Sequence, residues 1–291
     1  MNWLVTGGSG QLGIAVSDEL DSRGISFTAM GSKDLDITDT ISVRDFVAQN
    51  SPPVIINCAA WTDVDGAESN EESASKVNGV GPENLAVAAA SNGCRLIHVS
   101  TDYVFSGEGQ TPFEIDSQID PQSAYGRTKA DGEKKVLTTY PQNSYVVRTA
   151  WLYSAEGKNF AKTMTRLALN SDGEVRVVND QFGQPTSAVD LAKQIVDLGL
   201  SSAQAGIYHG TNGGQASWFE FAREIFSLAG ADINRVVPVS SSEYPRPAKR
   251  PSYSVLSHRE WSKTSITPMR DWKIALASMM TEIITSVKAE G

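Results

Sequence analysis

Short apolar runs alternate with helical patterns through the first half of the chain. Five runs are predicted to be buried strands: "WLVTGG" (3–8), "ISFTAM" (25–30), "VIINCAA" (54–60), "RLIHVS" (95–100) and "YVVRTAW" (145–151). Between them, "QLGIAVSDELDSRG", "SVRDFVAQN" and "NGVGPENLAVAAASNG" have helical spacing, and the last ends in an Asn-Gly stop signal. This alternation predicts a parallel sheet with right-handed crossovers and helices on both faces. We therefore expect a doubly wound α/β fold of the Rossmann type.

The pattern loosens after about residue 151. The segment "EVRVVNDQFGQPT" (174–186) predicts a strand that runs into a turn, and "SSEYPRPAKRPS" (241–252) predicts a proline-rich loop. Helical periodicity returns in "SWFEFAREIFSLAG" and "MRDWKIALASMMTEIITSV". We expect one domain over residues 1–150 and a smaller C-terminal α/β domain over 151–291, from which some segments return to the first domain.

Composition narrows the class of protein. The 291 residues are 40% hydrophobic and 20% charged, which is typical of soluble globular proteins. A formal charge of −9 argues against a nucleic-acid partner, and the apolar runs are too short for a membrane span. Met1 leads directly into "NWLVTGG" without a signal peptide, so we expect a cytoplasmic protein. Two cysteines favour neither a disulfide framework nor a cysteine metal site, and the three histidines are scattered enough to suggest structural roles.

The first predicted strand is followed by a glycine-rich loop, "TGGSGQLG". Gly7, Gly10 and Gly13 are spaced three apart, G-x-x-G-x-x-G, in place of the G-x-G-x-x-G of many dehydrogenases. Glycines allow close backbone approach to a pyrophosphate, and the following helix offers free N–H groups and a positive dipole. The loop could also be simple turn chemistry, but its position directly after a strand favours a nucleotide cofactor.

The end of the second strand bears on which cofactor is bound. An NAD site usually places Asp or Glu there to bind the adenosine ribose. This chain has Gly31, Ser32 and Lys33, which leave room and one positive charge for a 2′-phosphate, although Asp34 and Asp36 are close by. We expect NADPH, with NADH as the alternative.

The segment "AYGRTK" (124–129) supplies a candidate acid–base pair. On a helix, Tyr125 and Lys129 share a face one turn apart. A nearby ammonium is expected to lower the tyrosine pKa, so that the phenol can exchange a proton with a carbonyl or alcohol oxygen. Thr101 ends the fourth strand in "HVSTDYVF", where ligands bind in open α/β sheets, and its hydroxyl could bind the same substrate oxygen.

"TGGSGQLG", "STDYVF" and "YGRTK", in this order, resemble an extended short-chain dehydrogenase/reductase. The segments "NCAAWTDVDGAES", "VRTAWLY", "NFAKTM", "VVNDQFGQPT" and "RPSYSVL" resemble the branch that acts on a deoxythymidine-diphosphate sugar. The resemblance implies reduction of the C4 ketone of dTDP-4-dehydro-L-rhamnose, with hydride from the cofactor. Tyr125 would then protonate the C4 oxygen, Lys129 would tune it and hold the nicotinamide ribose, and Thr101 would assist.

The resemblance also places the binding residues. Those implied to lie along the cofactor, beside the glycines, Ser32 and Lys33, are Gln11, Leu12, Asp36, Ile37, Ala59, Ala60, Trp61 and Thr62. Those implied on the sugar-nucleotide side are Val64, Asp102, Tyr103 and Trp151, of which Trp151 could instead be a core residue. The basic cluster Arg246, Lys249 and Arg250 suits a diphosphate, and Arg250 is its strongest candidate.

One departure concerns metal. Some members of the family dimerise around Mg²⁺ held by acidic residues, whose positions correspond here to Ala15 and Val189. Neither side chain can bind a hard cation. We therefore expect no metal requirement, and a monomer or weak homodimer.

Three rival functions share parts of this pattern. A dehydratase of the superfamily needs an acid after its Thr-Asp, where this chain has Tyr103. A nucleotide-sugar epimerase retains NAD⁺ and needs no net reductant. The regulatory subunit of methionine adenosyltransferase looks similar but acts as a binding partner. The intact set of Thr101, Tyr125 and Lys129 favours an enzyme.

Overall fold

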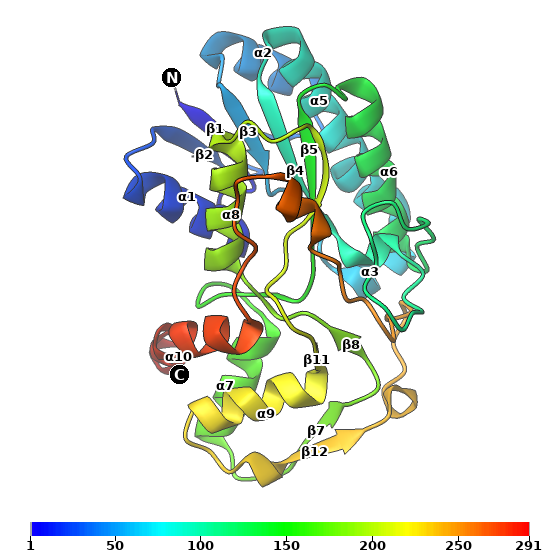
Figure 1. Cartoon of the computed structure of the whole chain (residues 1–291), viewed down its shortest axis with the longest axis vertical. Coiled ribbons are helices and arrows are strands. Elements are labelled where there is room, and N and C mark those ends of the chain that lie inside the picture. The colour runs from blue at the N-terminus through cyan, green and yellow to red at the C-terminus, as the bar shows by residue number, and fades with distance from the viewer. Residues whose placement is uncertain (1, 291) are drawn as a thin grey trace.

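A six-stranded parallel sheet forms the centre of the larger part of the molecule (Figure 1). The computed structural model describes residues 2–290. The spatial order is β2-β1-β3-β4-β5-β10, and the strands are β1 (Trp3–Thr6), β2 (Phe27–Met30), β3 (Val54–Asn57), β4 (Arg95–Thr101), β5 (Ser144–Thr149) and β10 (Gly206–His209). Because every pairing in this sheet is parallel, all its strands end at one edge.

Helices cover both faces of this sheet (Figure 1). Helices α1 (Gln11–Ser22) and α8 (Ala188–Leu200) pack on one face, and α2 (Thr40–Asn50), α5 (Gly81–Asn92) and α6 (Ala124–Thr139) lie on the other. Successive residues of β1 alternate between the two cores, with Trp3 and Val5 facing α1 and α8 and Leu4 facing the opposite core. The predicted doubly wound α/β fold is confirmed.

Two elements of this larger part come from late in the chain. Strand β10 forms the edge of the sheet beside β5, and α8 packs closely on α1. Neither was assigned from the sequence, although Leu191, Ile195 and Leu198 of α8 have helical spacing and are buried against the sheet. Segments from beyond residue 151 thus form part of the larger sheet and its helical cover.

Short helices lie between β3 and α5 and support the start of α6. They are α3 (Val64–Ser69), α4 (Glu71–Ser75) and a π-helical turn, Lys76–Val80. Glu68 accepts a hydrogen bond from the Ala124 amide at 2.8 Å, and Glu71 forms an exposed ion pair with Arg127 at 2.7 Å. The first turn of α6 is thus held from outside the sheet.

The smaller part of the molecule has a core of its own. Its helices are α7 (Phe160–Asn170), α9 (Trp218–Leu228) and α10 (Trp272–Ala289). A parallel pair, β7 (Val175–Val178) and β12 (Val236–Val239), packs beside α9, and two-residue strands form the pairs β6 (Leu152–Tyr153) with β9 (Thr186–Ser187) and β8 (Phe182–Gly183) with β11 (Ala216–Ser217). Phe221, Ile225, Leu276 and Met280 are fully or almost fully buried between these helices. No helix within residues 2–290 is both long and apolar enough to cross a membrane.

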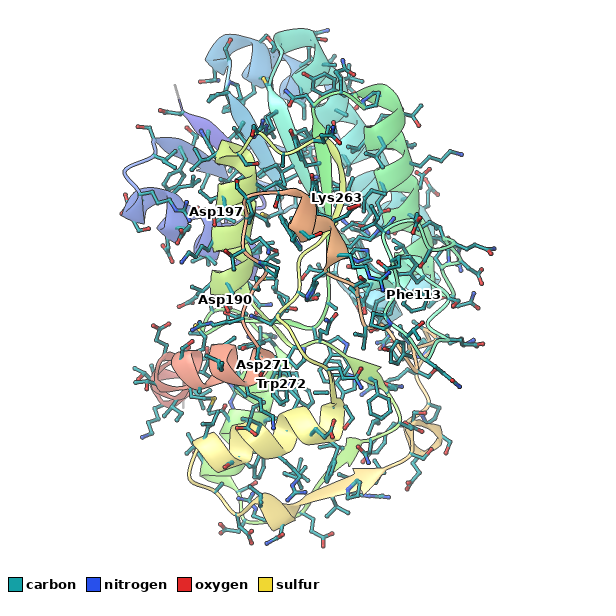
Figure 2. All side chains as sticks on the ribbon, viewed as in Figure 1. Phe113, Asp190, Asp197, Lys263, Asp271 and Trp272 are labelled. Atoms are coloured by element: carbon teal, nitrogen blue, oxygen red, sulfur yellow. The ribbon has the colours of Figure 1, made fainter. Side chains whose placement is uncertain are left out.

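Asp190 on α8 ties the larger part to the start of α10. Its carboxylate accepts hydrogen bonds from Arg270 Nε at 2.8 Å, Arg270 Nη2 at 2.9 Å and Asn212 Nδ2 at 2.8 Å. Asp271 then caps α10 by accepting from the Lys273 amide, and Trp272 is buried in the core of the smaller part. Figure 2 shows Asp190, Asp271 and Trp272 following one another across this junction.

A buried ion pair joins α6 to β5. Arg148 and Glu133 have side chains that are 1% and 5% exposed, and the guanidinium contacts both carboxylate oxygens, with Nη2–Oε2 at 2.8 Å. Arg148 also donates to the Ile115 carbonyl at 3.1 Å and lies over the Phe105 ring. The pair therefore fixes α6 on the sheet and anchors the segment that leads from β4 to α6.

We expect Glu133→Gln to lower the free energy of unfolding by about 3 kcal/mol, because it leaves the Arg148 charge buried without its counter-ion. Chemical denaturation measures this change. The matched control is Glu71→Gln, which breaks a solvent-exposed pair with Arg127 and should cost less than about 1 kcal/mol. Equal losses in the two variants would contradict this role for the buried pair.

Candidate active site

The glycine loop lies where β1 ends and α1 begins, beside the end of β3. Gly7 has φ +68° and an added Cβ would lie 2.5 Å from the Ala59 nitrogen. A Cβ on Gly13 would lie 2.2 Å from the Gly7 carbonyl oxygen. Gly10 precedes the first turn of α1, and no side chain of the described residues caps that helix. The loop therefore presents bare backbone at a helix N-terminus, which suits a pyrophosphate.

Most of the residues predicted to lie near the adenine end form hydrogen bonds or packing contacts within the protein. Asp34 accepts a hydrogen bond from the Gly31 amide at 3.0 Å, and Asp36 accepts from the amide and hydroxyl of Thr38. Ile37 is buried beneath Gly81 at the start of α5. Ser32 and Lys33 are exposed beside the turn, and Lys33 forms no ion pair within residues 2–290. That cation remains available for a 2′-phosphate.

The predicted cofactor residues that follow β3 lie between the glycine loop and α6. Ala59 donates its amide to Asn57 Oδ1 at 3.1 Å, and Trp61 donates its amide to Asn78 Oδ1 at 2.8 Å. Ala60 is half-buried and Thr62 is exposed. Trp61 packs in the same small apolar cluster as Tyr125, so this segment reaches the predicted acid.

Gln11 also contacts the smaller part of the molecule. Its Oε1 accepts hydrogen bonds from Asn159 Nδ2 at 2.9 Å and Ser154 Oγ at 3.2 Å. Asn159 in turn caps α7 through the Lys162 amide at 2.9 Å. The next residue of α1, Leu12, is buried against the sheet. The side chains of Gln11 and Leu12 are therefore engaged within the protein, and the N-terminus of α1 offers its backbone N–H groups to a cofactor.

Tyr125 stands at the first turn of α6, close to the end of β4. Its hydroxyl is close enough to Thr101 for that side chain to lower the pKa of the phenol, and its ring meets the Tyr103 ring edge-on with centroids 5.5 Å apart. A Cβ on Gly126 would lie 2.3 Å from the Tyr103 carbonyl oxygen, so glycine at this position lets the helix approach the turn after β4. The structure thus brings the predicted Thr101 and Tyr125 together.

Lys129 is buried one turn later and points toward β4. Its Nζ donates to the Val99 carbonyl oxygen at 2.6 Å and lies 3.5 Å from His98 Nε2. Burial lowers the pKa of this amine to about 8, and the nearby Glu133 carboxylate opposes the fall.

The expected fall in the Tyr125 pKa is not seen. Burial raises the pKa of this phenol to about 12, while the hydrogen bond to Thr101 lowers it and the charge of Asp102 raises it. Burial is the largest of these effects and outweighs the fall that the Lys129 cation was expected to produce. The phenol therefore keeps its proton at neutral pH, which makes it an acid and not a base in this state.

Asp102 is fully enclosed beside these groups. Its Oδ1 accepts from the Thr101 hydroxyl at 3.0 Å, and burial raises its pKa to about 6 even though hydrogen bonds to the carboxylate oppose that rise. The carboxylate is 2% exposed, so it shapes the site through Thr101 and does not line an open cavity.

A cavity of about 710 Å³ opens beside Tyr103, between the two parts of the molecule. Four cations line it, together with aromatic residues: Arg176, Arg246, Lys249, Arg250, Tyr103, Phe160, Trp218 and Tyr244. A concave surface with aromatic rings and several cations fits a nucleoside diphosphate. All three residues of the basic cluster predicted from the sequence are among its lining.

Asp65 anchors the basic loop across this cavity. It accepts from the Ala248 amide at 3.2 Å and from Arg250 Nη2 at 2.8 Å, whereas Arg250 Nη1 is buried without a hydrogen-bond partner in the described residues. Lys249 pairs with Glu108 at 2.9 Å and Arg176 pairs with Glu243. The loop is therefore held in place, while one guanidinium nitrogen of Arg250 has no partner among the described residues.

Trp151 and Val64 are placed differently from Tyr103. Trp151 has φ +46° at the exit of β5 and stacks on Trp218, with ring centroids 3.5 Å apart. It therefore lies behind a residue that lines the cavity. Val64 is half-buried at the start of α3 and is not among the residues that line the cavity.

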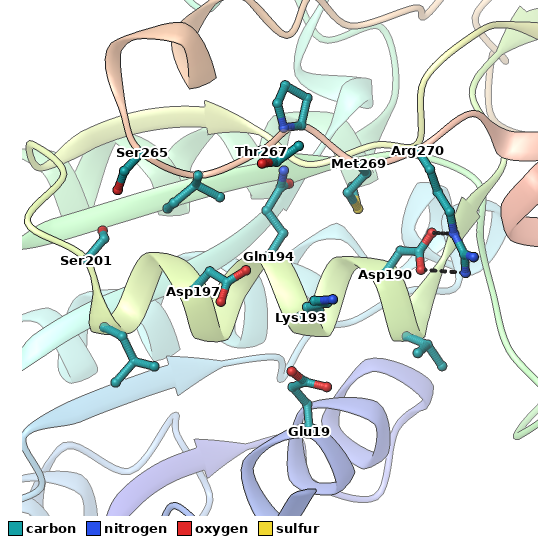
Figure 3. A pocket seen from close by; sticks show the side chains of 14 residues that line it. Glu19, Asp190, Lys193, Gln194, Asp197, Ser201, Ser265, Thr267, Met269 and Arg270 are labelled. Carbon is teal, nitrogen blue, oxygen red and sulfur yellow. Dashed lines mark hydrogen bonds and ion pairs between the residues drawn. The ribbon is translucent and has the colours of Figure 1, made fainter. Parts of the chain in front are cut away.

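A second groove, of about 840 Å³, lies along α8 and the 265–270 segment (Figure 3). It contains none of the predicted catalytic or cofactor residues, and Asp190 at its edge is already paired with Arg270. Val189 lines this groove and is 43% exposed, while Ala15 is packed in the core. Within residues 2–290, no group of three or more His, Cys, Asp or Glu side chains is arranged to hold a metal ion.

Sequence reasoning missed Arg176, Phe160, Trp218 and Tyr244 as residues of the cavity. Arg176 stood inside a predicted strand, and its outward position follows the alternation of β7. Trp218 follows the cap of α9, and its aromatic side chain is the signal that could have suggested a binding surface.

Comparison with known proteins identifies relatives along almost the whole chain. A sequence model of the family described as RmlD substrate binding domain matches residues 1–285. The dTDP-4-dehydrorhamnose reductase of Streptomyces griseus is 49% identical, over 94% of this chain and 91% of that protein. The dTDP-4-keto-6-deoxy-D-glucose reductase of Streptomyces niveus is 45% identical, over 94% of each chain. The crystal structure of dTDP-4-dehydrorhamnose reductase from Bacillus anthracis in complex with NADP superposes with a TM-score of 0.92, at 38% identity, covering 97% of this chain and 100% of that one.

We expect Gly13→Ala to weaken cofactor binding. The added Cβ would lie 2.2 Å from the Gly7 carbonyl oxygen, so that carbonyl must move away and the loop must open. NADPH titration by fluorescence should show at least a roughly tenfold weaker Kd, equivalent to about 1.4 kcal/mol. Gly173→Ala is a control for loss of a glycine, since no atom lies within 4 Å of its added Cβ and its backbone is not in the left-handed region. Unchanged NADPH affinity in folded Gly13→Ala would contradict this role of the loop.

Proposed function

The chain belongs to the RmlD substrate binding domain family, and we propose that it reduces the C4 ketone of dTDP-4-dehydro-L-rhamnose to give dTDP-L-rhamnose, with NADPH as reductant. The observation that carries the proposal is that Tyr125 lies beside Thr101 at the carboxyl edge of the sheet, with Lys129 buried one helical turn away, next to a cavity lined by four cations. The acid and the anion-binding surface are contributed by different parts of the fold.

The residues present fit NADPH. The loop of Gly7, Gly10 and Gly13 leaves room for a pyrophosphate where a Cβ would clash, and exposed Lys33 suits the 2′-phosphate. Ala59, Ala60, Trp61 and Thr62 lead from this loop toward the acid. When bound, NADPH supplies the hydride that is added to the sugar C4.

Tyr125 supplies the proton. Its phenol, which is protonated at neutral pH, donates to the C4 oxygen as negative charge develops there. Thr101, whose hydroxyl donates to Asp102 in this structure, would turn that hydroxyl toward the same oxygen when substrate binds, and the Lys129 ammonium stabilises the phenolate that remains. The proton therefore moves from Tyr125 to the sugar, as the reduction of a ketone requires.

The cavity beside Tyr103 is proposed to bind the nucleotide part of the substrate. Arg250 Nη1 is buried and unpartnered in the described residues, and a diphosphate oxygen would satisfy it. Trp218, supported from behind by Trp151, offers an aromatic surface for the sugar or the base. Asp102 contributes by orienting Thr101, and Val64 directly precedes Asp65, which lines the cavity.

We further propose that residues 1–150 bind mainly the cofactor and residues 151–291 mainly the substrate. Both cysteines are free thiols, which is consistent with the reducing environment of the cytoplasm. Ala15 and Val189 offer no ligand to Mg²⁺, so the proposal includes metal-independent activity in a monomer or weak homodimer.

The rival functions receive less support. An epimerase needs no net reductant, whereas the two Streptomyces relatives described above are both named reductases. The dTDP-4-keto-6-deoxy-D-glucose reductase relative gives a specific second candidate, in which the sugar has the D-glucose configuration. A purely regulatory role gives no reason for Tyr125 and a buried Lys129 to lie one turn apart at the end of the sheet.

We expect Tyr125→Phe to reduce kcat by about 10²- to 10⁴-fold, because the ring is retained while the proton donor is lost. The measurement is the loss of NADPH absorbance with dTDP-4-dehydro-L-rhamnose generated in situ, compared with dTDP-4-keto-6-deoxy-D-glucose. Tyr140→Phe, at the far end of α6, is the control and should retain activity. Fast turnover of the second sugar alone would move the proposal to that substrate, and intact wild type that oxidises NADPH with neither sugar would refute it.

The pH dependence should show an alkaline limb with an apparent pKa of about 8, which is the lowered value for Lys129. As pH rises through this value, the amine loses the charge that stabilises the developing phenolate, while Tyr125, with its pKa raised to about 12, keeps its proton. Activity should therefore fall on the alkaline side. A kcat/KM that stays constant up to about pH 10 would contradict the assignment of this limb to Lys129.

A further inference from the structure

A line of buried polar side chains crosses the sheet and ends at Lys129. Thr6 on β1 donates to Asn57 Oδ1 at 2.7 Å, Asn57 Nδ2 lies 3.0 Å from His98 Nδ1, and His98 Nε2 lies 3.5 Å from Lys129 Nζ. Thr6, Asn57, His98 and Lys129 are each at most 1% exposed. The line connects β1, β3 and β4 to the helix that carries the proposed acid.

Hydrogen-bond directions along this line fix where the His98 proton sits. The Ala59 backbone amide can only donate, and it donates to Asn57 Oδ1 at 3.1 Å, which places the Asn57 NH₂ group toward His98. His98 Nδ1 must then accept, so the neutral imidazole carries its proton on Nε2. Burial and the Lys129 charge hold the His98 pKa well below its usual value, which keeps the ring neutral.

The Nε2–H group therefore faces the Lys129 amine. An ammonium has no lone pair to accept this hydrogen, whereas a neutral amine does. The contact favours the neutral amine, while the Val99 carbonyl keeps the nitrogen in place at 2.6 Å. Other groups near Lys129 act differently: Glu133 favours the charged amine but is itself paired with Arg148, and the Cys58 thiol has its pKa raised by burial to about 12.

We propose that His98 is a positioning residue of the reductase: its Nε2–H, oriented by Asn57, sets the pH above which Lys129 loses its proton and the reaction slows. Tyr125, one turn before Lys129, remains the group that donates to substrate. The inference rests on the proposed function for its kinetic consequence, and the geometry it requires can be tested separately. His98, for which the sequence suggested only a structural role, thereby influences the reaction.

The kinetic test is the pH profile of NADPH oxidation by His98→Phe. Phenylalanine keeps a ring in the sheet but removes the N–H that faces Lys129, so the alkaline limb should move up by roughly half to one pH unit. A merely structural loss would lower kcat at all pH values without moving the limb. His258→Phe is the control, because His258 contacts Thr211 at 2.7 Å and not Lys129, and its limb should match the wild type. A limb that stays in place or moves down in folded His98→Phe overturns the proposal.

A second measurement needs no mutant of His98 to fold. The ¹⁵N NMR spectrum of histidine-labelled wild type, with His209→Gln and His258→Gln used for assignment, reports the tautomer of each ring. His98 should appear neutral with its proton on Nε2 across neutral pH, and a proton on Nδ1 or an imidazolium overturns the proposal. If wild type oxidises no NADPH with either sugar, the proposed function fails, while the spectrum still decides whether His98 presents its N–H to Lys129.

Discussion

The close approach of α6 to its neighbours is the constraint on which the site depends. A Cβ on Gly126 would lie 2.3 Å from the Tyr103 carbonyl oxygen, and one on Gly132 would lie 2.0 Å from the Asn78 carbonyl oxygen. At both glycines the backbone of α6 therefore packs directly against the backbone of a neighbouring segment. With the helix at this depth, Tyr125 reaches Thr101 and Lys129 reaches the carbonyl of Val99. The buried pair of α6 and β5 then prevents the helix from moving away.

Burial is also the main cause of the electrostatics of the site. It raises the pKa of Tyr125 and lowers that of Lys129, because each neutral form needs less solvation than its charged form. At neutral pH the phenol is therefore a proton donor and the amine stays charged but close to titration. This combination suits a ketone reduction, which consumes a proton as the alkoxide forms. The same burial leaves His98 neutral, so its ring can act on Lys129 as a fixed dipole.

Two contacts connect this site to the smaller part of the molecule. Gln11, beside the glycine loop, accepts from Asn159, and Asn159 caps the helix whose first residue, Phe160, lines the cation-lined cavity. Across that cavity, Asp65 of α3 holds the loop that carries Arg250. The proposed cofactor and nucleotide sites are thus joined through side chains of both parts.

Local periodicity and fixed spacing predicted the first five strands of the sheet, the glycine loop and the candidate acid, because they specify strands, helix starts and a tyrosine–lysine pair. The sequence did not reveal that β10 completes the sheet, or that Arg176 and Trp218 face Arg250 across one cavity. It also misjudged the Tyr125 pKa, since spacing shows that Lys129 is one turn away but not how strongly burial acts on the phenol. Such features depend on burial and on contacts between residues far apart in the chain, and only the tertiary structure decides these.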